Sequence, residues 1–330
     1  MKLAFVMDPI SQISYKKDST LAMIVDAQEK GHEIFYILPN RLFFNSDKPC
    51  AEFSPISVKY EESSWYEKGE NTISSLDFFD AILMRQDPPF DMDFINNTYI
   101  LEAATKLGVK VFNDPKALRD NNEKLAILDY PSLITDTIVS SSKEIIKDFV
   151  DKNFEVVIKP LGLMGGEGIK RLHHEDSDLL ETLNLIDQKK EKMMIQKFIP
   201  EVFEGDKRVI LISGEDCGFS VTRIPQGDDF RGNLAAGGKA EVRELNDRDL
   251  EIVNAIKPKL IKNGILVAGI DILGSFLTEI NITSPTCLRE LYDQQGINLA
   301  KDLIEQIEKL FNGKHLRYRL WTKIYWLCHR

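Results

Sequence analysis

Residues 269–289 read Gly269-Ile-Asp-Ile-Leu-Gly-Ser-Phe-Leu-Thr-Glu-Ile-Asn-Ile-Thr-Ser-Pro-Thr-Cys-Leu-Arg289. Apolar β-forming residues flank a Gly-Ser dipeptide, and this pattern predicts two short strands joined as a hairpin. Three oxygen-bearing side chains interrupt the apolar pattern, namely Asp271, Glu279 and Asn281. Because alternate residues of a strand share a face, Glu279 and Asn281 are expected to point the same way.

The register of this hairpin depends on its turn. An odd-numbered loop or a bulge places Asp271 opposite Glu279, whereas a strict two-residue turn pairs Asp271 with Thr278. We expect the first register. Two carboxylates and an amide on one face suit Mg²⁺, although the same spacing is equally typical of an exposed polar strand face. The remainder of the chain has to decide between these two interpretations.

The composition limits the classes of protein and partner. The 330 residues, 28% of them charged with a net charge of −10, predict two domains or one large α/β body. The acidity disfavours nucleic acid and acidic membrane surfaces as partners. Four widely spaced cysteines indicate neither a disulfide scaffold nor a zinc site, and no segment resembles a signal peptide or a membrane span. We therefore expect a cytoplasmic protein.

The first third of the chain alternates strand and helix patterns. We predict strands at 3–7, 33–38, 80–85 and 109–112, and helices at 21–29 and 92–106, with a loop or short β excursion at 40–76. This order predicts a Rossmann-like parallel sheet with right-handed crossovers. Arg85 ends one of these strands, so it is either an anion-binding side chain at the ligand crevice or part of an ordinary salt bridge.

A glycine-rich segment follows the next predicted strand. Residues 154–159 form a β-branched run that ends at Lys159, and glycines at 162, 165, 166 and 168 come before a further predicted strand at 169–172. Glycines let backbone amides approach phosphate oxygens closely, and a nearby lysine supplies the counter-charge. We interpret this segment as a flap over phosphates, and its simpler alternative is a glycine-rich hairpin.

Three later segments have features of a binding site. Residues 193–199 resemble a short strand that either contacts an adenine edge or belongs to the core, and Asp206 and Arg208 begin the next strand. Residues 223–239 combine four glycines with cationic side chains, which suits a mobile lid, although a disordered loop would look similar. Helices are expected at 247–262 and 299–310. The basic, aromatic residues 314–330 are expected to be poorly ordered.

Taken in order, these residues resemble an ATP-grasp ligase. More closely, the chain resembles prokaryotic-type glutathione synthetase over about residues 1 to 310, in segments 7–10, 16–19, 84–90, 118–124, 223–227, 231–238 and 278–286. The resemblance implies an α/β fold that becomes α+β in its C-terminal part. It comprises an N-terminal Rossmann-like pre-ATP-grasp domain (1–122) and a two-lobed ATP-grasp domain (123–313) with the lid at 223–239, followed by the tail (314–330).

The family resemblance also implies a reaction and a set of roles. ATP would phosphorylate γ-glutamylcysteine, and glycine would then displace phosphate to give glutathione. The implied ATP-binding residues are Lys124, Lys159, Gly165, Gly166, Gln196, Lys197, Ile199 and Asp206. The implied metal ligands are Asp271, Glu279 and Asn281, for Mg²⁺ or alternatively Mn²⁺. The implied catalytic arginines are Arg208, Arg223 and Arg231. The implied substrate contacts are Arg85, Ser284 and Arg289. The assembly implied is a homotetramer.

Two other functions would share many of these residues. A ligase that adds glutamate or D-alanine would keep the nucleotide and metal residues, but the lid motif at 231–238 argues against it. A non-catalytic ATP-binding module would need only the lysines. The presence of the acidic residues and the arginine-bearing lid together favours catalysis.

Overall fold

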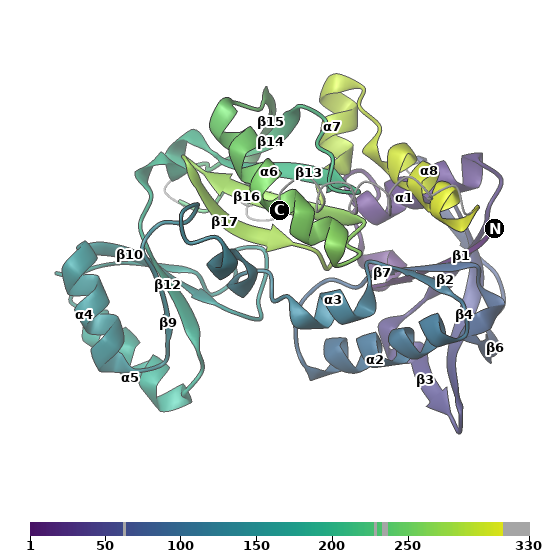
Figure 1. Ribbon diagram of the computed structural model, residues 1–330, viewed down its shortest axis with the longest axis horizontal. Coiled ribbons are helices and arrows are strands. Elements are labelled where there is room, and N and C mark those ends of the chain that lie inside the picture. The colour runs from purple at the N-terminus through teal and green to yellow at the C-terminus, as the bar shows by residue number, and fades with distance from the viewer. Residues whose placement is uncertain (62–63, 228–229, 233–236, 313–330) are drawn as a thin grey trace, which may run out of the picture.

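The computed structural model describes residues 1–312 except 62–63, 228–229 and 233–236. The predicted tail at 314–330 and these parts of the predicted lid lie outside the described residues. The described chain contains three sheets. Figure 1 shows the N-terminal sheet on one side, a small lobe built on the second sheet on the other side, and the third sheet between them. The α/β class predicted from the sequence is confirmed.

The N-terminal sheet has a parallel centre in the order β2-β1-β7-β8, flanked by helices. Its strands are β1 (Lys2–Met7), β2 (Glu33–Ile37), β7 (Ala81–Arg85) and β8 (Lys110–Phe112), and its helices are α1 (Ser19–Glu29), α2 (Met92–Lys106) and α3 (Pro115–Asp120). The apolar run of β1 is buried on both faces: Ala4 and Val6 pack into one core cluster, and Leu3 and Phe5 into another. This is the environment expected of a parallel strand. The predicted β-α-β opening is confirmed.

Residues 40–76 form the predicted β excursion. Four strands extend the sheet in antiparallel pairs: β3 (Leu42–Asn45), β4 (Lys48–Val58), β5 (Tyr66–Lys68) and β6 (Thr72–Ser75). Single-turn helices η1 (Ile10–Gln12), η2 (Pro39–Arg41), η3 (Leu76–Phe78), η4 (Leu125–Asp129) and η5 (Pro200–Glu204) occupy several connections.

The small lobe is an antiparallel sheet in the order β11-β10-β12-β9, with two helices beside it (Figure 1). Its elements are β9 (Thr137–Ser140), α4 (Lys143–Asn153), β10 (Glu155–Pro160), β11 (Lys170–His173), α5 (Leu179–Lys189) and β12 (Met193–Lys197). Ser142 caps α4 by accepting a hydrogen bond from the amide of Ile145, as expected for an N-cap serine. Helix α5 was not predicted from the sequence. Its buried residues Leu179, Leu183 and Ile186 pack into the apolar cluster of the lobe.

The central sheet is antiparallel in the order β15-β14-β13-β16-β17. Its elements are β13 (Asp206–Ile212), β14 (Phe219–Ile224), β15 (Lys239–Glu244), β16 (Val267–Leu273) and β17 (Phe276–Asn281), and the helices after β15 are α6 (Asp247–Lys262), α7 (Leu288–Gln295) and α8 (Leu299–Phe311). Asp271 pairs with Glu279, with a register shift between Asp271 and Ile272, so the predicted register is confirmed. One boundary differs, because Arg223 lies inside β14 and Lys239 begins β15, where sheet pairing outweighs the glycine-rich composition nearby.

Asn113 joins the N-terminal domain to the central sheet. Its side-chain amide donates to the carbonyl oxygens of Val267 and Ile282 at 2.8 and 2.7 Å, and its oxygen accepts from the amides of Leu266 and Val267 at 2.8 and 2.9 Å. All the hydrogen-bonding capacity of the side chain is used. Helix α8 packs beside α1 at the same junction (Figure 1). In the described part of the chain, the helices are too short or too polar to cross a membrane.

Candidate active site

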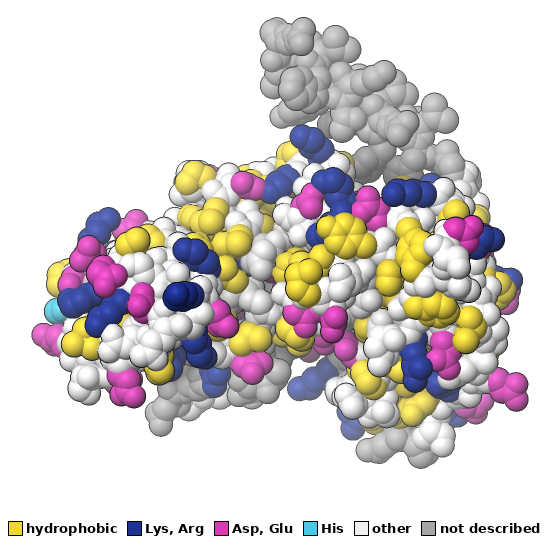
Figure 2. Space-filling view, turned by 90° about the horizontal axis from the view of Figure 1, so that it is seen from below, with side chains coloured by type: hydrophobic (Ala, Val, Ile, Leu, Met, Phe, Trp, Pro, Cys, Tyr) yellow, Lys and Arg dark blue, Asp and Glu magenta, His cyan; other side chains and the backbone are white. Residues whose placement is uncertain are grey.

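A cavity of about 790 Å³ lies where the three sheets meet. Its lining includes Asp8 from the N-terminal domain, Lys159 and Phe198 from the small lobe, and Asp271 and Glu279 from the central sheet. Figure 2 shows the molecular surface hollowed between the small lobe and the remainder of the molecule. The cavity therefore depends on segments that are far apart in the sequence.

Two of the lysines that line the cavity come from different segments, Lys159 from β10 and Lys124 from the turn before η4. Lys159 is the penultimate residue of β10, and burial lowers the pKa of its ammonium, although Glu279 counteracts this effect. Lys124 is buried, donates from Nζ to the carbonyl oxygen of Leu163 at 2.6 Å and lies 3.6 Å from Oε1 of Glu279. Two ammonium groups in one cavity suit a polyphosphate ligand. The structure thus brings together the two lysines predicted to hold phosphates.

The flap between β10 and β11 has the backbone geometry expected of a phosphate loop. Gly165 and Gly166 both have positive φ angles and both line the cavity. Arg231, from the lid, donates to the carbonyl oxygen of Gly166 at 3.2 Å. The described part of the lid therefore contacts the flap directly, and Arg231 also lines the cavity.

A buried charge network forms the cavity wall on β13, β14 and β16. Both carboxylate oxygens of Asp271 bind the guanidinium of Arg208, and Oδ2 also lies 2.8 Å from Arg223. Arg223 additionally pairs with Asp206. Burial raises the pKa of Asp206 to about 6, an effect that Arg223 only partly offsets. Burial would also raise the pKa of Asp271, but Arg208 and Arg223 outweigh it and hold this pKa well below its usual range.

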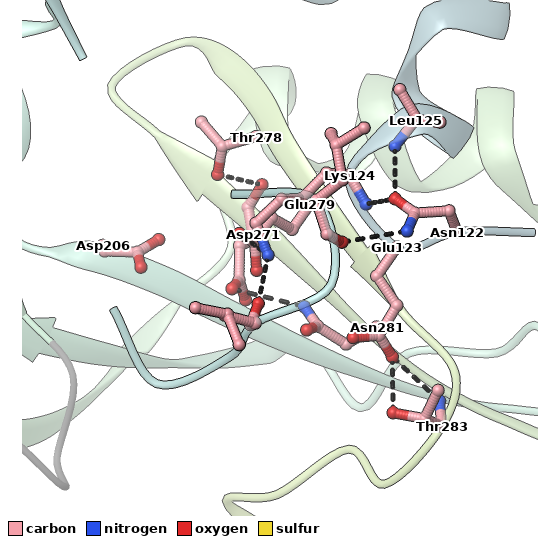
Figure 3. A network of polar contacts seen from close by, with 12 residues as sticks. Asn122, Glu123, Lys124, Leu125, Asp206, Asp271, Thr278, Glu279, Asn281 and Thr283 are labelled. Atoms are coloured by element: carbon pink, nitrogen blue, oxygen red, sulfur yellow. Dashed lines mark hydrogen bonds and ion pairs between the residues drawn. The ribbon is translucent and has the colours of Figure 1, made fainter. Parts of the chain in front are cut away.

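Glu279 and Asn281 provide donor atoms that fit a divalent cation. Figure 3 shows both side chains extending from β17 beside Asp271 and Lys124. The amide nitrogen of Asn281 lies 3.3 Å from Oδ2 of Asp271, which directs its oxygen away from this carboxylate. A carboxylate and an amide oxygen suit Mg²⁺. Asp271 fits less directly as the predicted third ligand, because the two arginines already bind both of its oxygens.

The segment predicted to contact adenine lies along the cavity at the end of β12. Gln196, Lys197 and Ile199 all line it, together with Phe198. The side chain of Gln196 is buried and donates to Oγ1 of Thr137 at 3.0 Å. The amides of Lys197 and Phe198 are bound to carbonyl oxygens of the lobe. This segment is therefore held rigidly beside the flap.

The three predicted substrate contacts differ in position. Ser284 lines the cavity, whereas Arg85 and Arg289 are absent from the described lining. Arg85 is buried and donates to Oγ1 of Thr20 at 3.0 Å and to the carbonyl oxygen of Pro285 at 2.8 Å. Arg289 pairs with Asp293 and stacks on Tyr60. Arg85 thus supports the cavity wall through Pro285, which lies between the lining residues Ser284 and Thr286. The partners of Arg289, Asp293 and Tyr60, lie outside the described lining.

Sequence reasoning gave no role to several acidic side chains that line the cavity. Glu123, Asp87 and Glu290 are among them, as is Asp8, which accepts a hydrogen bond from the amide of Asp87 at 2.8 Å. Asp8 and Asp87 each follow a predicted strand of a parallel sheet, and this placement could have identified them. Glu123 lies outside regular structure, and the only sequence signal that could have identified it is its position next to Lys124.

Comparison with known families accounts for this arrangement. Residues 1–119 match the family model of the prokaryotic glutathione synthetase N-terminal domain, and residues 123–296 match the model of the ATP-grasp domain of the same family. The chain belongs to the prokaryotic glutathione synthetase family. The resemblance inferred from the motifs is thereby confirmed.

Relatives in this glutathione synthetase family match nearly end to end. The glutathione synthetase of Pseudomonas syringae pv. tomato is 43% identical over 317 residues, which is 95% of this chain and 99% of the relative. The glutathione synthetase of Vibrio parahaemolyticus is 41% identical over 317 residues, which is 95% of this chain and 100% of the relative. The glutathione synthetase of Coxiella burnetii is 43% identical over 311 residues, which is 93% of this chain and 96% of the relative.

Solved structures show the same fold at low identity. A D-cycloserine synthetase superposes with a TM-score of 0.65 at 11% identity, covering 94% of this chain and all of the other. A RimK-domain ATP-grasp protein from Sphaerobacter thermophilus gives a TM-score of 0.60 at 15% identity, with 92% and 98% covered. These likenesses confirm the ATP-grasp fold.

Proposed function

We propose that the chain is an ATP-dependent ligase that joins γ-L-glutamyl-L-cysteine to glycine through an acyl phosphate. The products are glutathione, ADP and phosphate. Membership of the family supports this activity, as do relatives named glutathione synthetase that match nearly end to end. The observation that carries the proposal is the cavity itself, which is lined by cationic side chains and by oxygen donors for a metal: Lys124, Lys159, Arg208, Arg223, Arg231, Glu279 and Asn281.

The proposed first step makes the carboxylate electrophilic. An oxygen of the cysteinyl carboxylate attacks the γ-phosphorus of ATP, the bond to the bridging oxygen breaks, and ADP leaves. Lys124, Lys159 and the amides of Gly165 and Gly166 would hold the phosphates, with Asp206 at the edge of this site. The segment from Gln196 to Ile199 would contact adenine.

Glu279 and Asn281 would hold Mg²⁺, with Asp271 beside them. When bound, Mg²⁺ neutralises charge on the phosphate oxygens. Mn²⁺ is an alternative ion with similar ligand preferences.

The proposed second step forms the amide bond. The glycine amine attacks the acyl carbon, the tetrahedral intermediate collapses, and phosphate leaves while the amine loses its proton. Arg208 and Arg223, oriented by Asp271, would stabilise the negative charge of this intermediate. Arg231 in the lid would help to exclude water, which would otherwise hydrolyse the acyl phosphate. Arg85, Ser284 and Arg289 would shape the dipeptide site.

Further parts of the proposal concern the molecule as a whole. We propose a pre-ATP-grasp domain at 1–122 and an ATP-grasp domain at 123–313, a homotetrameric assembly and a cytoplasmic location. The proposed partners are these small substrates, with neither nucleic acid nor membrane among them.

An acceptor-dependence assay tests the proposed reaction. Purified protein with ATP, Mg²⁺ and γ-glutamylcysteine is expected to release phosphate rapidly only after glycine is added, with glutathione detected by mass spectrometry. L-Alanine, D-alanine and L-glutamate serve as control acceptors. Equal turnover with any of these acceptors would contradict the proposed specificity and favour another carboxylate–amine ligase of the same fold.

A further inference from the structure

Glu123 binds the chain on both sides of Asn281. Its backbone oxygen accepts a hydrogen bond from the amide of Ile280 at 3.0 Å, and its carboxylate Oε1 accepts one from the amide of Ile282 at 2.8 Å. The same Oε1 accepts from the amide and the hydroxyl of Thr283 at 2.9 and 2.8 Å. The other edge of β17 pairs with β16. Asn281 is therefore held between a strand on one side and a single residue on the other.

The two neighbours of Glu123 bind the flap. Asn122 donates from its side chain to the carbonyl oxygen of Leu161 at 2.9 Å, and Lys124 donates to that of Leu163 at 2.6 Å. The side-chain oxygen of Asn122 also accepts from the amides of Lys124 and Leu125, at 3.1 Å each. Figure 3 shows this turn beside the strand that carries Glu279 and Asn281. Three consecutive residues thus contact two walls of the cavity.

We propose that Glu123 is a positioning residue that orients Asn281 toward a divalent cation and, with Asn122 and Lys124, couples the flap to strand β17. This inference rests on the proposed use of a metal–nucleotide complex. Replacing a side chain that orients a metal ligand typically lowers metal affinity or activity roughly 10- to 100-fold.

The contacts of Glu123 indicate which property of its side chain matters. Within the described chain, its carboxylate only accepts hydrogen bonds, from two amides and one hydroxyl. Glutamine keeps an acceptor oxygen on a side chain of the same length, whereas alanine removes it. If positioning is the role, the charge is dispensable and the acceptor oxygen is required. If Glu123 instead paired with a substrate ammonium or accepted a proton, both substitutions would be damaging.

The test measures nucleotide binding as a function of metal concentration. A fluorescent ATP analogue is titrated with Mg²⁺ in the absence of γ-glutamylcysteine and glycine, using wild type, Glu123→Gln and Glu123→Ala. For Glu123→Ala we expect the Mg²⁺ concentration at half-maximal binding to rise roughly 10- to 100-fold. Glu123→Gln is expected to remain close to wild type. Thr283→Val, which removes only the hydroxyl donor, is expected to shift the midpoint less and in the same direction.

A matched control separates positioning from a loss of stability alone. Asn298→Ala removes the N-cap of α8 and a 2.9 Å hydrogen bond to Asp26, and neither residue lines the cavity, so it should lower stability without changing the Mg²⁺ midpoint. A normal midpoint in Glu123→Ala or in Thr283→Val, or equal damage in Glu123→Gln and Glu123→Ala, would overturn the inference. Because the assay contains neither the dipeptide nor glycine, a failure to make glutathione would refute the proposed function and leave this comparison valid.

Discussion

Asp271 is a residue of the type expected for a metal ligand, but its contacts indicate a different role. Its carboxylate was predicted as a metal ligand because it lies opposite Glu279, and the register is as expected. In the structure, both of its oxygens bind guanidinium groups. Removing one partner from a buried ion pair is costly, so we expect Asp271 to act first by orienting Arg208 and Arg223. Glu279 and Asn281, whose side chains carry fewer contacts, remain the better candidates for metal ligation.

At Glu279, replacement by glutamine tests metal ligation directly. Glu279→Gln keeps the shape of the side chain and removes one charge from the proposed ligand set, so we expect turnover to fall by about 100-fold or more. Phosphate release at saturating ATP is the measurement, with the exposed Glu33→Gln as the control. Near-normal turnover of Glu279→Gln at low Mg²⁺ would show that Glu279 is not a metal ligand.

Asp206 gives a pH-dependent prediction for stability. Its pKa is raised to about 6 in the folded protein, against about 3.9 in an unfolded chain. Between these values the folded state binds more protons than the unfolded state does, so stability falls as the pH rises from about 4 to about 6 and then levels off. Urea unfolding of wild type and Asp206→Asn should show the wild type losing stability relative to the variant over this range. A constant difference would contradict the raised pKa.

At the scale of elements, the position of the flap depends on a glycine that leaves no room for a side chain. Gly168 has a φ of +68°, and a β-carbon built there would lie 2.8 Å from Cγ of Pro160 at the end of β10. Gly165 has a similar φ with open space around it. A side chain at 168 would therefore displace the flap relative to Lys159, in addition to straining the backbone.

An alanine at Gly168 is expected to weaken ATP binding. We expect the KM for ATP to rise on the order of tenfold, since the displaced amides no longer match the phosphate oxygens. Gly108→Ala is the matched control, because Gly108 also has a positive φ, of +97°, but has open space and lies between α2 and β8. Both variants should lose about 1 kcal/mol of stability from left-handed strain. An unchanged KM in Gly168→Ala would argue against a phosphate-binding flap.

At the scale of the whole molecule, the cavity is assembled by three sheets. Asn113 fixes the N-terminal domain to the central sheet, and the segment from Asn122 to Lys124 connects the central sheet to the small lobe. The described residues that line the cavity end at Glu290. The relatives are matched almost completely over 311 to 317 residues, fewer than the 330 of this chain.

Removal of residues 314–330 is therefore expected to leave catalysis unchanged. The residues to which the proposed reaction gives a role all precede this segment in the sequence, the last of them being Arg289. Steady-state kcat and KM of the shortened protein are the measurements, together with its thermal midpoint. A marked loss of turnover with the thermal midpoint unchanged would assign the tail a role in the reaction.

The sequence alone determined the order of elements around the site, because hydrophobic periodicity and turn residues act over short distances. Strand β1, helix α2, the flap at Gly165 and Gly166, and the hairpin that carries Asp271 and Glu279 were all predictable for this reason. The family followed from motifs in the same segments. Helix α5 and the strand pairing of Arg223 were missed, because tertiary packing overrides weak local signals.

Only the tertiary structure decided which polar groups meet. The hydrogen bonds that Glu123 accepts from Ile282 and Thr283 join residues about 160 positions apart, and those that Asn113 accepts span a similar separation. No local pattern encodes such contacts, since they form only when segments distant in the sequence pack against one another. Pairing within the central sheet has a similar effect on Asp271: β16 pairs with β13 so that Asp271 lies opposite Arg208, and the predicted ligand becomes the partner of two arginines.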